Sequence, residues 1–444
     1  MMTELQKLAT RIDKLQATFP IGHVTAVNGG LIDVAGLGDV AGIGDRLRIA
    51  RRGGSALSAE VVGLGRDNVR ALPDGPSNNI TVGDTVRLCA AVDFAPDDSW
   101  IGRVIDPMGQ PADGKPLVRG QVARDINAAP PTASARRPLG ARLETGLAVF
   151  NTMLPVVRGQ RIGLFAGSGV GKSQLMATFA RQLEADVVVI ALIGERGREV
   201  GHFVRDVLGA KGMSRSVVVA ASSDQSPLMR RRCAGAAMAV AEHFRDAGKQ
   251  VLLLADSVTR FAEAHREIAV AAGEPPALRG YPPSTAAMIG GLCERAGTGM
   301  DGQGDITAIF SVLVPGSDME EPVADMLRGV LDGHVVLSRR IAERGRYPAI
   351  DLLQSVSRSL PDAATDAENT RIGEARRLLG AYQQAEVMIQ SGLYAAGSDP
   401  LLDQAVRAWP ELDAFIARSE PGDIASSFDR LSLILRRAGV GPSR

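Results

Sequence analysis

The sequence predicts an α/β protein in three parts: a small N-terminal β-barrel, a central domain with a parallel sheet, and a C-terminal helical domain. In the middle of the chain, apolar strand-like runs alternate with helical patterns, which is typical of a parallel sheet covered on both faces. Short β-type runs between glycine turns precede this region, and no strand pattern follows Pro361. The predicted central strands are residues 161–166, 187–193, 217–221, 251–255 and 306–314.

The composition is that of a globular protein. Of 444 residues, 45% are hydrophobic and 23% charged, which excludes wholesale disorder, collagen and a coiled-coil filament. The 50 basic residues offset the 50 acidic ones, so no whole-chain field would hold nucleic acid, and no nucleic-acid partner is expected.

The cysteines and the N-terminus indicate a reducing compartment. Cys89, Cys233 and Cys293 lie far apart without C-x-x-C spacing, so neither a disulfide framework nor a zinc site is expected. The N-terminus lacks a secretory signal, and no apolar run approaches the roughly 18 residues of a membrane span. We therefore expect a cytoplasmic protein.

Residues 1–18 are expected to form a short amphipathic helix. Leu5, Leu8, Ile12 and Leu15 recur at spacings of three and four, which places them on one stripe. Two heptads are marginal alone, so such a helix needs a surface to cover. A docking element for a partner and a helix or frayed tail that belongs to its own domain are about equally favoured.

Residues 19–92 are expected to form the barrel, since short strands joined by glycine turns are typical of small closed barrels. Such a barrel can bind single-stranded nucleic acid through stacked aromatic side chains, but Phe19 and Phe94 only flank the region, which favours a structural role. The predicted strands are residues 23–27, 31–34, 46–49, 59–64 and 85–88.

The other two domains follow from the same patterns. We expect residues 93–360 to form the central domain, entered through a loop-rich stretch. Residues 361–444 show only helical periodicity and are expected to form the helical domain. Its predicted helices are residues 363–379, 381–391 and 400–416.

A phosphate-binding loop carries the strongest chemical signal. Residues 166–173 read Ala-Gly-Ser-Gly-Val-Gly-Lys-Ser and lie between a predicted strand and a helical run, the context such a loop requires. Glycines allow backbone N–H groups to converge on phosphate oxygens near a helix N-terminus. The usual first glycine is Ala166 here. The predicted nucleotide-binding residues are Gly167, Ser168, Gly169, Val170, Gly171, Lys172, Ser173 and Gln174.

Acidic residues follow two of the predicted strands. Asp256 ends an apolar strand and would hold Mg²⁺ directly or through water, although many such aspartates only cap a helix. Glu195 follows residues 187–193 and would emerge near the terminal phosphate, where a carboxylate can polarise the attacking water. Arg196 would orient Glu195 or the phosphate; a solvated charged turn is the alternative for this segment.

Several blocks in one order resemble the ATPase of type III protein export, a family similar to the catalytic subunit of rotary ATP synthases. The resemblance covers nearly the whole chain after Phe19. It implies a RecA-like P-loop ATPase core in a homohexameric ring. The blocks are the loop at 166–173, residues 194–199, 256–261, 273–276 with 280–283, and 331–334 with 337–339.

The resemblance also implies residue roles, with ATP and Mg²⁺ as cofactors. Lys172 would bind phosphate, Ser173 and Asp256 would hold Mg²⁺, and Glu195 would activate water. Arg358 matches an arginine finger supplied by a neighbouring subunit. Tyr347 matches an adenine-stacking position and Tyr394 is a candidate for the other face of the base; both tyrosines could equally be packing residues.

The partners implied are a central stalk, a regulatory or stator protein on the N-terminal helix, the export gate at the inner membrane, and export substrates with their chaperones. Residues 280–283 and 343–348 look more like the flagellar member than the injectisome members, whereas residues 284–291 are smaller than is usual. The alternatives are an injectisome ATPase, a rotary ATP synthase catalytic subunit, a hexameric RNA helicase and a ring subunit that holds ATP without hydrolysing it.

Overall fold

The computed structural model describes residues 18–90, 93–314, 319–420 and 422–440. The helix predicted over residues 1–18 lies outside these ranges except for its last residue. The described residues form two compact units. One comprises the described residues up to Asp93 together with Gln225–Arg230 and Glu263–Pro282, and the other comprises the remaining described residues.

The first unit contains a closed barrel in the strand order β1-β2-β5-β4-β3-β6. Alternate side chains point inward, such as Ile32 and Val34 of β2, which are fully buried. Gly29 and Gly30 have positive φ angles and form the two-residue turn between β1 and β2. The strands are β1 (Ile21–Asn28), β2 (Leu31–Ala35), β3 (Arg46–Ile49), β4 (Leu57–Leu64), β5 (Asn68–Pro73) and β6 (Thr85–Leu88).

The five predicted barrel strands are confirmed, and β5 was missed. Its sequence alternates buried Val69 and Ala71 with exposed Asn68 and Arg70, so it contains no apolar run. The pairing of β5 with β2 and β4 completes the barrel.

The second unit is built on a sheet in the order β15-β14-β8-β13-β11-β9-β10-β7, with β12 paired to β13. All neighbours are parallel except β14 with β15 and β12 with β13. Its strands are β7 (Val104–Ile105), β8 (Arg161–Ala166), β9 (Val187–Glu195), β10 (Ser216–Ser222), β11 (Val251–Asp256), β12 (Gly297–Thr298), β13 (Asp305–Leu313), β14 (Gly333–Leu337) and β15 (Ile350–Ser357).

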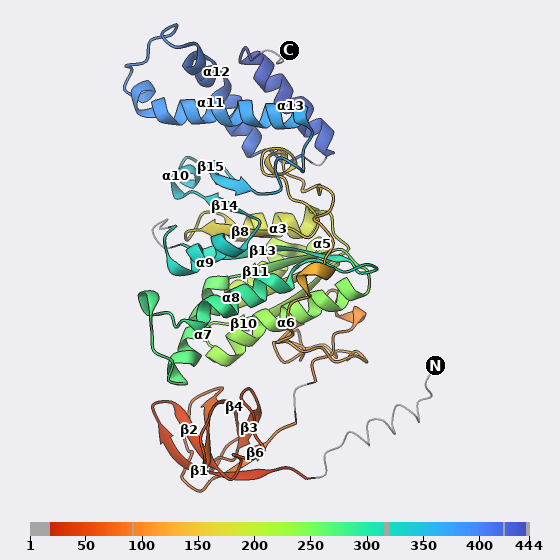
Figure 1. Ribbon diagram of the computed structural model, residues 1–444, viewed down its shortest axis with the longest axis vertical. Coiled ribbons are helices and arrows are strands. Elements are labelled where there is room, and N and C mark those ends of the chain that lie inside the picture. Colours follow the sequence, from red (N-terminus) through yellow and green to blue (C-terminus); the bar gives the residue numbers. More distant parts are fainter. Residues whose placement is uncertain (1–17, 91–92, 315–318, 421, 441–444) are drawn as a thin grey trace. The chain divides into compact units, whose positions relative to one another are not determined.

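Helices lie on both sides of this sheet (Figure 1), and β9 and β11 are buried along almost their whole length. The predicted α/β fold is therefore confirmed. The helices outside the C-terminal region are α2 (Ala148–Asn151), α3 (Lys172–Gln182), α4 (Gly197–His202), a π-helical turn (Phe203–Leu208), α5 (Gly209–Met213), α6 (Pro227–Asp246), α7 (Val258–Ala271), α8 (Ser284–Arg295), α9 (Pro322–Val330) and α10 (Arg339–Glu343), with 3-10 turns at Asp98–Trp100, Ala133–Ala135 and Leu278–Gly280.

The C-terminal region is helical, in α11 (Asp366–Gln390), α12 (Pro400–Ile416) and α13 (Ile424–Arg437). Two predicted helices, 363–379 and 381–391, are in fact the single helix α11. A capping box between Thr365 and Glu368 starts it, and it continues through Gly380, where a glycine costs only about 1 kcal/mol relative to alanine. Helix α13 was missed, although Phe428, Leu431 and Leu435 have helical spacing and are buried.

Candidate active site

The loop between β8 and α3 has the geometry of a phosphate-binding loop. Gly169 and Gly171 have φ angles of 76° and 86°, and nothing lies within 4 Å of a Cβ built on Gly169. Gly167, Ser168, Ser173 and Gln174 are exposed or half-buried, whereas the Val170 side chain is buried in the core. Helix α3 begins at Lys172 without a side-chain cap, so its first N–H groups are available to an anion.

Lys172, Asp256 and Glu195 come together at the carboxyl ends of β8, β11 and β9. The Lys172 ammonium group donates a hydrogen bond to Asp256 and lies 3.9 Å from Glu195 Oε1. The Lys172 side chain is only 11% exposed. A buried lysine faced by two carboxylates is an arrangement that accepts phosphate and metal charges together.

A buried hydroxyl that the sequence analysis missed fixes Asp256. Ser311, on β13, is fully buried and donates a hydrogen bond of 2.7 Å to Asp256 Oδ1. Because β11 and β13 are adjacent parallel strands, Ser311 lies beside Asp256 at the same edge of the sheet. A polar residue within the apolar run 306–314 was the signal that could have identified it.

Glu195 has the titration behaviour of a general base. Burial, first, and the negative charge of Asp256 raise the pKa of Glu195 to about 6, although the Lys172 charge opposes the rise. Glu199, four residues later in α4, contributes to the same rise through a hydrogen bond and through its charge. A carboxylate with a pKa near neutrality can both accept and release a proton at cellular pH.

Arg196 does not point at Glu195. Its guanidinium donates to Glu199 Oε1 at 2.8 Å and is 69% exposed. This hydrogen bond lowers the pKa of Glu199, so Glu199 stays ionised beside Glu195. Glu199 is therefore a second contributor that the sequence analysis quoted in a motif but did not assign.

Arg358 lies away from this cluster. Strand β15 runs antiparallel to β14, so its start, Ile350, is level with Ala166 at the loop, and its end, Ser357, is level with the start of β8. The β14 partners of Ile350 and Ser357 are Leu337 and Gly333, which are four residue steps of about 3.3 Å apart, so the two levels are separated by ~13 Å. Arg358 follows Ser357, is exposed, and donates to the carbonyl oxygen of Arg328 at 3.1 Å.

The two predicted adenine contacts have different surroundings. Tyr347 is 52% exposed and lies over the loop, because a Cβ built on Gly171 would be 3.1 Å from Tyr347 Cδ1. A flat, half-exposed ring there can stack on a base. The hydroxyl of Tyr394 instead donates to Asp403 of α12, which ties it to the helical region.

The donor set suits Mg²⁺. Ser173 and Asp256 offer only oxygen ligands, which this hard cation prefers, and Mg²⁺ usually takes few protein ligands beside phosphate and water. In the described ranges, no group of three or more His, Cys, Asp or Glu side chains is arranged to hold a metal. The three cysteines, all described, form no disulfide.

Comparisons with known proteins agree with this geometry. The nucleotide-binding domain of the ATP synthase alpha/beta family matches residues 146–357, its β-barrel domain matches residues 24–89, and the C-terminal domain of the type III secretion ATPase EscN matches residues 364–432. A flagellum-specific ATP synthase of Caulobacter vibrioides is 43% identical over 97% of this chain and 99% of its own length. The chain belongs to the family of flagellar and type III secretion ATPases.

Other members support the same placement. A type 3 secretion system ATPase of Xanthomonas euvesicatoria is 40% identical over 97% of both chains. The assembled EscN of enteropathogenic E. coli has a TM-score of 0.87 at 34% identity and covers 93% of this chain and 100% of its own. EscN solved with its central stalk EscO has a TM-score of 0.84.

Because it belongs to this family, the chain is an ATP-hydrolysing enzyme of protein export. The family resemblance, the function and the use of ATP that the sequence predicts are therefore confirmed. The roles of individual site residues stay predictions. No helix of the described ranges combines the length and the apolar character needed to cross a bilayer.

Proposed function

We propose that the chain is the MgATP-hydrolysing subunit of a homohexamer that energises flagellar protein export. Its barrel (19–92), ATPase domain (93–360) and helical domain (361–444) would follow an N-terminal helix over residues 1–18. The hexamer is supported by the assembled form of its relative EscN and by the position of Arg358 described below.

In this proposal the loop binds the phosphates of ATP. Backbone N–H groups of residues 167–173 surround the β and γ phosphates, and Lys172 leaves Asp256 to neutralise them. Ser173 and Asp256 hold Mg²⁺, the latter oriented by Ser311. When bound, Mg²⁺ offsets charge on the phosphate oxygens during transfer.

Glu195 then takes the proton of the attacking water. Its pKa near 6 leaves it mostly ionised at neutral pH, and Glu199 supports it from α4. Arg196 acts indirectly, because it binds Glu199 and not the reacting groups.

One observation carries the assembly: Arg358 lies at the opposite edge of the sheet from its own loop. Arg358 lies ~13 Å along the sheet from the level of the loop, and its guanidinium donates to the carbonyl oxygen of Arg328 on α9, so it does not contact the nucleotide site of its own subunit. It would instead stabilise the transition state in a neighbouring subunit, as arginine fingers do.

Mixed assembly tests this proposal. Arg358→Ala and Glu195→Gln should each abolish turnover alone while preserving nucleotide binding, with a loss of about a thousandfold for Arg358→Ala. A mixture should recover partial ATPase activity, because one interface of a mixed ring pairs an intact Glu195 with an intact Arg358. Wild-type activity of Arg358→Ala, or no recovery in rings shown to be mixed, would refute a finger in trans.

The partners follow from the same family. A central stalk is proposed because EscN is solved with EscO. We also propose a regulatory or stator protein on the N-terminal helix, the export gate at the inner membrane, and export substrates that hydrolysis unfolds or releases from chaperones. The protein would act in the cytoplasm, peripherally attached to the membrane apparatus. Copurification from the native cell would distinguish this assignment from an injectisome or a rotary ATP synthase.

A further inference from the structure

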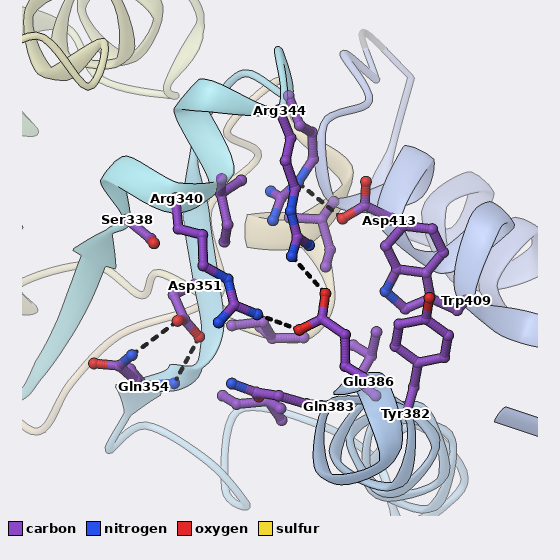
Figure 2. A pocket seen from close by; sticks show the side chains of 16 residues that line it. Ser338, Arg340, Arg344, Asp351, Gln354, Tyr382, Gln383, Glu386, Trp409 and Asp413 are labelled. Atoms are coloured by element: carbon purple, nitrogen blue, oxygen red, sulfur yellow. Dashed lines mark hydrogen bonds and ion pairs between the residues drawn. The ribbon is translucent and has the colours of Figure 1, made fainter. Parts of the chain in front are cut away.

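A cavity of about 260 Å³ separates α10 and β15 from helices α11 and α12. Figure 2 shows Arg340 and Arg344 pointing toward Glu386, with Tyr382, Trp409 and Asp413 on the helical side. Three arginines and three carboxylates line the cavity, so their formal charges balance: Arg340, Arg344, Arg346, Asp351, Glu386 and Asp413. A balanced lining has no excess charge with which to recruit an ionic ligand, which favours a role in the junction itself.

Two of the arginines join the helical region to α10. Arg340 and Arg344 are four residues apart and both donate to the carboxylate of Glu386 on α11. The Glu386 side chain is only 10% exposed, so its two oxygens are held by charges from the other side of the cavity.

The third arginine reaches the segment that carries Tyr347. Arg346 donates to the carbonyl oxygens of Pro348 at 3.0 Å and Ile350 at 2.8 Å, so the backbone on the far side of Tyr347 is folded around its guanidinium. Its Nε lies 3.0 Å from Asp413 Oδ1 of α12, and the side chain is 10% exposed. Asp413 of α12 therefore holds the Arg346 guanidinium, and this guanidinium in turn shapes the segment that carries Tyr347.

Tyr347 itself contacts the loop. Its ring lies against Gly171, the residue before Lys172, and half of its surface is exposed. Displacement of residues 346–350 would move this ring and leave the loop, which belongs to β8 and α3, in place.

We infer that the Arg346–Asp413 ion pair positions Tyr347 over the nucleotide, so that a carboxylate of the C-terminal helices sets the affinity for the adenine half of ATP. Asp413 and Arg346 are positioning residues, since neither would touch the nucleotide. The inference rests on the proposed role of Tyr347 as the adenine contact.

The test measures binding of MgADP and of magnesium pyrophosphate by calorimetry. Tyr347→Ala should weaken ADP by about tenfold, the loss of one aromatic stack, and leave pyrophosphate unchanged. Asp413→Asn should weaken ADP by about three- to tenfold with pyrophosphate unchanged. Asp413→Asn in the Tyr347→Ala background should add nothing, because both act through one ring.

Three further variants complete the design. Asp413→Glu should restore ADP affinity. Arg346→Lys keeps the charge but cannot donate to both carbonyls, so it should reproduce the selective loss even where Asp413→Asn fails to fold. Glu411→Gln, two residues away on α12 in an exposed pair with Arg437, is the matched control and should bind both ligands normally.

The outcomes separate the two levels of the proposal. A selective loss of ADP affinity in Tyr347→Ala, with no such loss in Asp413→Asn and Arg346→Lys, would overturn the inference but leave the proposed role of Tyr347 intact. Equal loss of ADP and pyrophosphate in these variants would show a general structural defect and overturn it as well. Normal ADP binding by Tyr347→Ala would refute the adenine contact and the inference with it.

Discussion

The two ends of the central sheet carry charged clusters that differ in how completely their charges are paired. At the amino end, the Arg161 guanidinium donates two hydrogen bonds of 3.0 Å to Asp332 and one of 2.6 Å to Glu294, and Glu294 also lies 3.9 Å from a second cation, Arg136. At the carboxyl end, one ammonium group, that of Lys172, is shared by Asp256 and Glu195.

The paired charges at the amino end therefore contribute to stability, and the charges at the carboxyl end contribute to the chemistry. Bidentate pairs satisfy both partners and fix the strands and helices that meet at the amino end. At the carboxyl end, two carboxylates share one ammonium group beside an open loop. Lys172 alone does not offset the effect of burial there, so the pKa of Glu195 is raised. Substitutions at the two ends should therefore affect different measurements.

The largest effect is expected for Glu195→Gln. The amide keeps the shape but cannot take a proton, so turnover should fall by about 10²–10⁴-fold while the Kd for MgADP stays within about twofold. Steady-state phosphate release and calorimetry measure the two. Glu184→Gln, which changes an exposed carboxylate paired with Arg158, is the control and should be unaffected. Near-normal hydrolysis by Glu195→Gln would show that another group activates the water.

Substitutions at the amino end of the sheet should lower the stability of the fold. Arg295 donates bidentately to Glu242, at 2.8 and 2.7 Å, and these side chains are 5% and 7% exposed. Arg295→Ala leaves the Glu242 charge buried and unpaired, which should lower the free energy of unfolding by about 3–5 kcal/mol.

Urea unfolding of Arg295→Ala measures this loss, and the ADP affinity of the folded variant should stay normal. Arg437→Ala breaks an exposed pair with Glu411 and should cost less than about 1 kcal/mol. If Arg295→Ala unfolds like the wild type but binds ADP poorly, the division between the two ends is wrong.

Much of this architecture could be predicted from the sequence because its signals are local. The loop at 166–173 combines a strand, glycines and a helix within a short segment, and β8 was predicted with its observed bounds. Strand β15 was missed because it is the edge strand of the sheet and mixes apolar with polar residues, as in the exposed Gln354 and Val356. Strand β14 was missed because it is only five residues long.

The parts that escaped prediction depend on contacts distant in sequence. Ser311 and Asp256 are 55 residues apart and meet only because β11 and β13 are neighbours. Arg346 and Asp413 meet only because α12 packs near the segment that follows α10, and the helical periodicity of a sequence does not reveal which segments pack together. The missed groups orient residues that the sequence did identify, and orientation is a property of tertiary packing.

The smallest expected effect concerns the pH dependence that Glu199 gives to Glu195. Glu195 must be ionised to act as a base, so kcat/KM should fall as the pH drops below about 6, the value to which burial raises its pKa. The charge and hydrogen bond of Glu199 contribute to that rise after burial and Asp256. Glu199→Gln removes this negative charge, lowers the pKa of Glu195 and should move the acid limb to lower pH by less than about one unit.

The nucleotide also titrates near this pH, since its terminal phosphate has a second pKa of about 6. Its contribution is common to the wild type and Glu199→Gln, so the difference between the two kcat/KM profiles reports the enzyme alone. Glu184→Gln should superimpose on the wild type. A limb that moves to higher pH in Glu199→Gln would contradict the sign of this effect and show that the acid limb belongs to another group.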